Sequence, residues 1–256
     1  MELGDFSQLA KEYIHRTGYS LSTLKALQAY VKQSVNKTSV VVADVGAGTG
    51  KLTENLSEIG LTGFAVEPND AMRAEGQYLF SGNSQFIWSK GTGEKTGLLD
   101  HSVDWVLMAS SFHWTNAALA LKEFKRILKP KGFFTALWNP RDLDKSTLHL
   151  KIEDKIHEML PELKRVSSGA KSYTKDIESN LTSTGDFKDV LFIESQHEVQ
   201  MEKPRYLGAW RSVNDIQAQA GPEKFQQILN MIENEIKDFD FVKVPYRTRS
   251  WTVQLK

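Results

Sequence analysis

The chain has 256 residues, of which 40% are hydrophobic and 25% are charged, as in folded domains with a core of their own and unlike disordered chains. Its 32 lysines and arginines are matched by 32 acidic residues, so the net charge is zero and the molecule has no overall positive field to attract nucleic acids or anionic membranes. The lack of cysteine excludes disulfide scaffolds, thiolate nucleophiles and cysteine-ligated metal sites.

The first half of the chain alternates helical patterns with short apolar runs. Ser20 is expected to cap an amphipathic helix that ends near Val35, and Asn116 to cap a later one. The apolar runs show no polar alternation, as expected for strands that are buried on both faces. They predict strands at residues 39–45, 63–67, 85–88, 103–108 and 133–138. Strands that alternate with helices at this spacing favour an α/β, doubly wound, mostly parallel sheet of the Rossmann-like type.

The second half has longer helices and only two predicted strands, at residues 189–195 and 242–253. These two strands would complete a seven-stranded sheet whose last strand is antiparallel. Thr174 is expected to cap a short helix that ends at Gly185, and Pro222 is expected to begin a strongly amphipathic helix.

We expect a single domain spanning residues 1–256, with a cofactor-binding core at residues 36–140. Residues 141–188 and 202–240 would form helical cover elements over the carboxyl ends of the strands. Within the first of these elements, charges of alternating sign between residues 151 and 175 indicate a solvated helical face.

A buried strand that contains Asp44 runs through three glycines, Gly46, Gly48 and Gly50, into a helix. Glycine tolerates positive φ and lets a ligand lie against the main chain, while the N-terminus of the helix points at that ligand. A flat or anionic ligand is therefore expected at this loop.

The spacing of the loop separates the cofactor classes that use such turns. A dinucleotide fingerprint needs a glycine where this chain has Lys51. A P-loop needs a glycine at Val45 and a hydroxyl side chain at Leu52, so both phosphate-binding patterns are disfavoured. Glu67 ends the next strand, where a carboxylate can accept hydrogen bonds from both hydroxyls of a ribose. A ribose without a pyrophosphate fits these residues best.

These features, with three further motifs, resemble the class I S-adenosylmethionine-dependent methyltransferases, and within them the trans-aconitate and type 11 branch that has small-molecule acceptors. The motifs follow one another in the expected order between residues 40 and 138. They are Val41–Gly50, Ala65–Asn69, Gly91–Asp104, Ala109–Trp114 and Arg126–Gly132. The resemblance implies the Rossmann-like fold of that family and S-adenosyl-L-methionine as the cofactor.

The resemblance also assigns cofactor contacts residue by residue. The glycines would pass beneath the methionine part, Asp44 would hold its ammonium group directly or through water, and Glu67 would bind the ribose. Thr92 stands where the family often has an aspartate for the adenine amino group, so the Thr92 hydroxyl, the neighbouring backbone or Glu94 would serve instead. The implied cofactor-binding residues are Tyr13, Arg16, Asp44, Gly46, Ala47, Gly48, Gly50, Glu67, Pro68, Asn69, Thr92, Gly93, Glu94 and Ser110.

The methyl acceptor is expected at the rim that follows the fourth and fifth strands. His113 could accept a proton from the acceptor or orient it, and Trp114 could form an apolar wall; alternatively, both residues pack a helix onto the sheet. Arg141 would suit an acidic acceptor or, alternatively, be a solvated surface arginine. Trp210 and Arg211 could close the pocket from the cover; alternatively, their helix buries the tryptophan and exposes the arginine. The expected substrate-binding residues are Tyr19, His113, Trp114, Trp138, Asn139, Trp210 and Arg211, and His113 is also the catalytic candidate.

We therefore expect a methyltransferase that modifies a small organic molecule at oxygen, in a carboxylate or a hydroxyl. Methylation at nitrogen or carbon, and a non-catalytic S-adenosylmethionine-binding sensor or assembly protein, are the alternatives. No metal, nucleic acid or membrane partner is expected, and the protein would be a monomer or a homodimer. Glu2 and Asp5 stand where a secretion signal would be basic, and no apolar run approaches the roughly 18–20 residues of a membrane span, which indicates a cytoplasmic location.

Overall fold

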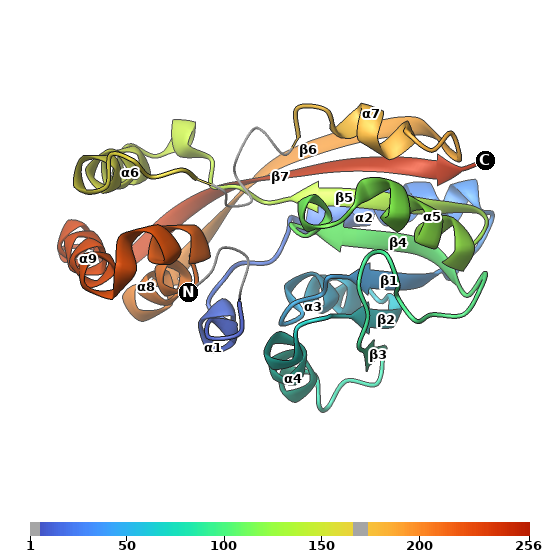
Figure 1. Cartoon of the computed structure of the whole chain (residues 1–256), viewed down its shortest axis with the longest axis horizontal. Coiled ribbons are helices and arrows are strands. Elements are labelled where there is room, and N and C mark those ends of the chain that lie inside the picture. The colour runs from blue at the N-terminus through green and yellow to red at the C-terminus, as the bar shows by residue number, and fades with distance from the viewer. Residues whose placement is uncertain (1–5, 166–173) are drawn as a thin grey trace.

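The computed structural model describes residues 6–165 and 174–256, so Glu2 and Asp5 lie outside the described residues. The strands form one sheet in the order β3-β2-β1-β4-β5-β7-β6 (Figure 1). β7 runs antiparallel to both of its neighbours, and the other paired strands are parallel. The strands are β1 (Val41–Val45), β2 (Thr62–Val66), β3 (Phe86–Ser89), β4 (Val103–Ala109), β5 (Leu128–Trp138), β6 (Phe187–Glu202) and β7 (Phe241–Leu255). The predicted seven-stranded, Rossmann-like sheet is confirmed.

Helices connect the strands and form a second group beyond the sheet. The side chains of Ser20 and Asn116 accept hydrogen bonds from backbone N–H groups of the helices that they precede, as predicted. Within the described residues, no helix combines the length and the apolar composition needed to cross a membrane. The helices are α1 (Ala10–Tyr13), α2 (Leu21–Ser34), α3 (Lys51–Glu58), α4 (Asp70–Leu79), α5 (Ala117–Ile127), α6 (Thr147–Met159), α7 (Ile177–Thr182), α8 (Lys203–Arg211) and α9 (Asn214–Glu235), with short 3₁₀ turns η1 (Phe112–Trp114) and η2 (Leu143–Lys145).

Each face of the sheet is covered by a different set of helices. Successive side chains of a strand point to opposite faces. Val106 and Phe134 pack in a core with residues of α5 and α7, whereas their neighbours Trp105 and Phe133 pack in a core with residues of α2 and α3. Because both faces are apolar, the central strands are continuous hydrophobic runs in the sequence.

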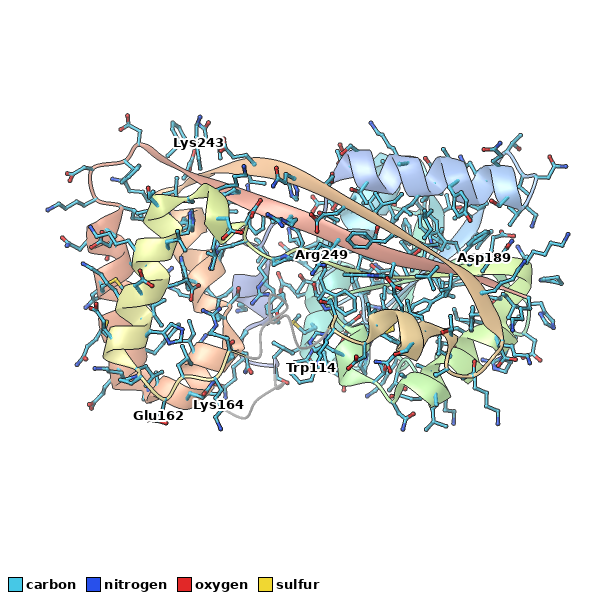
Figure 2. The ribbon with its side chains drawn as sticks, turned by 90° about the horizontal axis from the view of Figure 1, so that it is seen from above. Trp114, Glu162, Lys164, Asp189, Lys243 and Arg249 are labelled. Carbon is cyan, nitrogen blue, oxygen red and sulfur yellow. The ribbon has the colours of Figure 1, made fainter. Side chains whose placement is uncertain are left out.

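The ladder between β6 and β7 is longer than the sequence predicts. The strand expected at residues 189–195 extends over Phe187–Glu202 and pairs with β7 along nearly its whole length. The far ends of both strands pack with α6, α8 and α9 in a separate core, which we call the cover. Figure 2 shows Asp189 at the sheet end of the ladder and Lys243 at the cover end. The two strands thus join the cover to the sheet.

The starts of α7 and of the second part of α9 test two boundaries that the sequence predicts. α7 begins after Asp176, and the Thr174 hydroxyl does not cap it but accepts a hydrogen bond from Arg249 Nη1 at 3.4 Å, so the predicted cap is wrong. α7 also packs against α5 on the sheet, although it falls in the range 141–188 that was expected as cover; residues 166–173 of that range lie outside the described residues. α9 is kinked at Gly221, where φ is 72°, so its second part begins at Pro222, as predicted.

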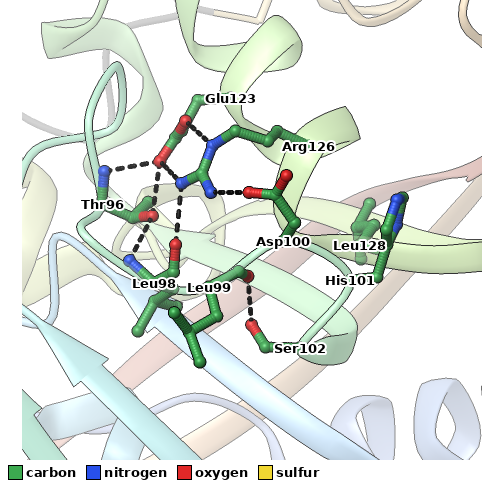
Figure 3. A network of polar contacts seen from close by, with 9 residues as sticks. All are labelled: Thr96, Leu98, Leu99, Asp100, His101, Ser102, Glu123, Arg126 and Leu128. Atoms are coloured by element: carbon green, nitrogen blue, oxygen red, sulfur yellow. Dashed lines mark hydrogen bonds and ion pairs between the residues drawn. The ribbon is translucent and has the colours of Figure 1, made fainter.

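A buried carboxylate fastens the loop between β3 and β4 to α5 (Figure 3). Glu123 accepts hydrogen bonds from the Thr96 backbone N–H at 2.8 Å and from the Thr96 hydroxyl at 2.6 Å, and it pairs with Arg126, which also pairs with Asp100. Burial by itself would raise the pKa of Glu123, but the hydrogen bonds from Arg126 and Thr96 lower it below its ordinary value. The network holds the loop that carries residues 92–94.

Replacing Glu123 by alanine is expected to lower the free energy of unfolding by about 1–3 kcal/mol, because the buried Thr96 N–H loses its acceptor. The matched variant Asp100→Ala removes only an exposed partner of Arg126 and should lower it by less than about 1 kcal/mol. Urea denaturation of both variants measures the difference. Equal losses in the two variants would contradict the role given to Glu123.

Candidate active site

A cavity of about 600 Å³ opens at the carboxyl ends of β1, β2 and β4, between the sheet and the cover. Its walls come from the segment before α2, from the strand ends, and from the cover. Ligands of open α/β sheets bind at this edge, where the strand order reverses. Among the residues that the structure describes, no group of histidine and acidic side chains is arranged to hold a metal ion.

The glycine loop after β1, residues 46–50, is hydrogen-bonded to the end of β2. The backbone N–H groups of Gly46 and Ala47 both donate to the Val66 carbonyl, at 2.8 and 3.1 Å. Gly46 has φ of 73°, and a Cβ there would lie 2.7 Å from the side chain of Ser111, so the position needs glycine both for its backbone and for space. The loop therefore presents bare main chain to the cavity.

Glu67 is held from both sides by backbone groups. One carboxylate oxygen accepts from the Gly48 N–H at 2.8 Å and the other accepts from the Asn69 N–H at 2.8 Å. The side chain is 6% exposed, and burial raises its pKa against the opposing effect of these two hydrogen bonds. Each oxygen keeps a free lone pair, so the carboxylate is already oriented to accept further hydrogen bonds from a ligand.

Asp44 is fully buried next to the loop and is only half satisfied. Its Oδ2 accepts a hydrogen bond from the Thr53 hydroxyl at 2.6 Å, whereas Oδ1 has no hydrogen-bond partner among the described residues. Burial raises the pKa of Asp44 to about 7. A buried oxygen without a donor is destabilising, and a cationic or hydrogen-bonding ligand in the cavity would relieve that cost.

The segment before α2 folds over the same cavity. Arg16 donates from Nε to the Ser212 hydroxyl at 2.7 Å and from Nη2 to the Ser212 carbonyl at 2.9 Å, and its guanidinium lies over the Tyr13 ring at 4.3 Å. The Tyr19 hydroxyl is hydrogen-bonded to the Ser110 hydroxyl at 3.1 Å. Arg16 thus ties this segment to α8 of the cover.

His113 lies in η1, at the wall of the cavity. Burial lowers its pKa to about 4, so the imidazole is neutral near pH 7. Trp138 Nε1 donates to His113 Nδ1 at 3.3 Å, and this contact assigns the proton of the neutral ring to Nε2. A ring in this state donates a hydrogen bond from Nε2 and is a weak base.

Most of the residues expected from the sequence do meet at this cavity. Those among its lining are Tyr13, Arg16, Tyr19, Asp44, Gly46, Ala47, Gly48, Glu67, Pro68, Asn69, Thr92, Gly93, Glu94, Ser110, His113, Trp114 and Asn139. Glu94 also accepts a hydrogen bond from the Asn116 backbone N–H at 2.7 Å, which holds the β3–β4 loop beside η1. The sequence therefore located the sheet side of the cavity closely.

Two expected residues serve packing next to the cavity instead of lining it. A Cβ at Gly50 would lie 2.7 Å from the Phe80 ring, so this glycine allows α3 to start against an aromatic pair and does not contact the cavity. Trp138 is 1% exposed and is buried against Trp251, at 5.8 Å between ring centroids. It reaches the cavity only through its hydrogen bond to His113.

Two further expected residues, both in the cover, do not line the cavity. Trp210 is 1% exposed, and its ring supports the guanidinium of Arg141, which does line the cavity. Arg211 ends α8 with an exposed side chain outside the cavity. Of the two arrangements that the sequence leaves open, the structure shows the helix that buries the tryptophan and exposes the arginine.

A charged cluster on the cover side was not foreseen. Arg165 pairs with Glu153 at 2.5 Å and with Asp215 at 3.1 Å, and these three side chains are only 23%, 16% and 2% exposed. All three line the cavity, so the solvated face predicted for residues 151–175 is wrong at Glu153 and Arg165. No sequence pattern predicts the cluster, because its members lie on segments that are distant in the sequence and meet only in the tertiary fold.

Comparison with known proteins agrees with this geometry. Residues 43–136 match the family described as methyltransferase domain. The chain is 44% identical over 101 residues to an uncharacterized methyltransferase of Mycobacterium tuberculosis, a match that covers 40% of this chain and 40% of the relative. It is 36% identical over 114 residues to one of Schizosaccharomyces pombe, covering 43% and 42%. Each match thus spans less than half the length of the curated relative.

The fold is similar to a solved structure along almost its entire length. A protein of Anaeromyxobacter dehalogenans, assigned as a type II methyltransferase, superposes with a TM-score of 0.62 at 17% identity and covers 93% of this chain and 97% of that chain. At this identity the likeness concerns the fold alone. The segment that matches the methyltransferase domain family spans β1 to β5, which form the sheet side of the cavity.

Proposed function

We propose that the protein transfers a methyl group from S-adenosyl-L-methionine to an oxygen of a small organic acceptor. The observation that carries the proposal is the pair of carboxylates at the ends of β1 and β2, one oriented by two backbone N–H groups and the other with an unpaired buried oxygen. A ribose diol suits the first carboxylate, and the ammonium of a methionine moiety suits the second.

The chemistry of the described residues suits this cofactor. Backbone at positive φ in Gly46 and Gly48 lies beside the carboxylates, so a nucleoside can approach the main chain closely. Asp44 Oδ1 lacks a hydrogen-bond donor among the described residues, and a bound ammonium would provide one. The cofactor, when bound, supplies a methyl group on a positively charged sulfur. The chain aligns the two ligands and excludes water. The segment that Arg16 holds against Ser212 and the cover both enclose the cavity.

The choice of oxygen rests on the weak basicity of the site. The pKa of His113 is lowered to about 4, so it would withdraw a proton from an amine, a phenol or an alcohol only poorly. A carboxylate is already ionised near pH 7 and needs no base. In this proposal His113 donates a hydrogen bond from Nε2 to position the acceptor, and the acceptor oxygen attacks without losing a proton to the protein.

Glu67→Ala is expected to weaken binding of S-adenosylhomocysteine by about 1–3 kcal/mol, because the ribose loses a charged acceptor. Glu67→Gln keeps the size of the side chain and should fall between the wild type and Glu67→Ala. Isothermal titration calorimetry measures the affinities, and urea denaturation checks that the variants remain folded. Unchanged affinity in Glu67→Ala would remove the ribose assignment.

The affinity for S-adenosylhomocysteine should also fall as the pH drops below about 7. Because the pKa of Asp44 is raised to about 7, acid protonates this carboxylate and removes the counterion of the ammonium. The affinity should therefore fall by up to about tenfold for each pH unit. The same raised pKa stabilises the unliganded fold at low pH, a contribution that is lost as the pH rises through about 7. Calorimetry between pH 5.5 and pH 8 measures the slope, and a slope that persists in Asp44→Asn would refute the assignment.

His113→Ala is expected to lower turnover by roughly tenfold or more while the affinity for S-adenosylhomocysteine stays unchanged, because the lost hydrogen bond positions only the acceptor. Between pH 6 and pH 8 the wild-type rate should not follow a histidine titration, because His113 is neutral throughout. Methyl transfer from labelled cofactor gives both results. A wild-type rate in the variant would exclude His113 from the mechanism.

A further inference from the structure

Among the described residues, one arginine in the wall of the cavity has neither an ion pair nor a side-chain hydrogen bond. Arg141 follows β5, and its guanidinium lies over the Trp210 ring at 3.9 Å. Its Nε is buried and makes no hydrogen bond, and within residues 6–165 and 174–256 no carboxylate oxygen lies within 4 Å of it. Backbone pairing of Arg141 with Tyr246 of β7 fixes the start of the side chain.

The other two arginines of the cavity differ in this respect. Arg165 is compensated by two carboxylates, and Arg16 is hydrogen-bonded twice to Ser212. Arg141 is therefore the arginine of the cavity lining whose side chain has neither an ion pair nor a hydrogen bond among the described residues.

Two described neighbours of Arg141 carry no charge near pH 7. His149 is 1% exposed, and burial, with the positive charge of Arg141 as the second cause, lowers its pKa to about 3, so it is neutral. Tyr206 is buried close by and is neutral near pH 7, because the ordinary pKa of tyrosine is about 10 and burial raises it further. A guanidinium that is partly desolvated among neutral groups destabilises the unliganded protein. Such a group is retained where a ligand supplies the missing charge.

We propose that the methyl acceptor carries a carboxylate and that this carboxylate pairs with Arg141. The inference rests on the proposed function and names the class of its substrate. A planar guanidinium held flat on an indole presents its N–H groups along one edge, which suits two parallel hydrogen bonds to a carboxylate. One unpaired arginine matches a single negative charge better than a doubly charged phosphate.

This pairing makes Arg141 a specificity-determining residue and gives Trp210 the task of supporting it. The guanidinium lines the same cavity as Asp44 and Glu67, so one ligand pair can occupy both parts of the cavity together. The acceptor is then a small organic acid whose carboxylate binds Arg141 on the cover side, away from Glu67, which would bind the ribose.

The test uses Arg141→Met, which keeps a long side chain on Trp210 but removes the charge, and Arg211→Met as a matched control outside the cavity. Thermal melting is recorded with and without S-adenosylhomocysteine, in the presence of a panel of small mono- and dicarboxylic acids, their amides and phosphate monoesters. Acids should raise the melting temperature of the wild type and of Arg211→Met, amides should not, and Arg141→Met should not respond. Without any acid, Arg141→Met should melt at or above the wild-type temperature.

Turnover gives a second readout. For an acid that is methylated, Arg141→Met should raise KM by roughly 10–100-fold, with unchanged affinity for S-adenosylhomocysteine. The proposal is overturned if no acid stabilises the wild type, if amides or phosphate monoesters stabilise it as well as acids do, or if Arg141→Met melts far below the wild type. An acid-induced shift that depends on Arg141 without any methyl transfer would uphold the acid site and refute the proposed function.

Discussion

The Glu67 carboxylate, held between the N–H groups of Gly48 and Asn69, is the interaction on which the rest of the site depends. It joins the glycine loop after β1 to the end of β2 and sets the distance between the two strand ends. The hydrogen bonds from the Gly46 and Ala47 N–H groups to the Val66 carbonyl join the same two segments. The resulting edge has bare main chain on one side, with one oriented carboxylate and one half-satisfied carboxylate at a common cavity. Groups that are already held in place by hydrogen bonds need less ordering when a ligand binds.

The second half of the molecule turns this edge into an enclosed space. The far ends of β6 and β7 pack with α6, α8 and α9, so the paired backbones of these two strands join the cover to the sheet (Figure 1). The cover contributes the ion cluster around Arg165 and, through Trp210, supports the uncompensated Arg141. The sheet side is therefore suited to a nucleoside with a cationic tail. On the cover side, Arg165 is balanced by Glu153 and Asp215, whereas Arg141 has no carboxylate partner among the described residues and is suited to an anion.

The sequence predicted the sheet side well because its signals are local. Apolar runs buried on both faces located the central strands, and glycine spacing with a carboxylate at Glu67 located the sheet side of the cavity. The cover was predicted less well because there the outcome depends on contacts between distant segments. Arg165 meets Asp215 only when the region after α6 lies beside α9, and Trp210 points under Arg141 and not into the cavity. Gly50 shows a further limit, since its glycine is required by Phe80, which no loop motif includes.

The most direct test of the central claim is a crystal structure of the protein with S-adenosylhomocysteine. The account predicts the nucleoside over the glycine loop, both ribose hydroxyls on the Glu67 carboxylate, the ammonium at Asp44 Oδ1, and the sulfur facing an open space that extends to Arg141. A nucleoside bound elsewhere, or bound in this cavity with its ribose away from Glu67, would contradict it.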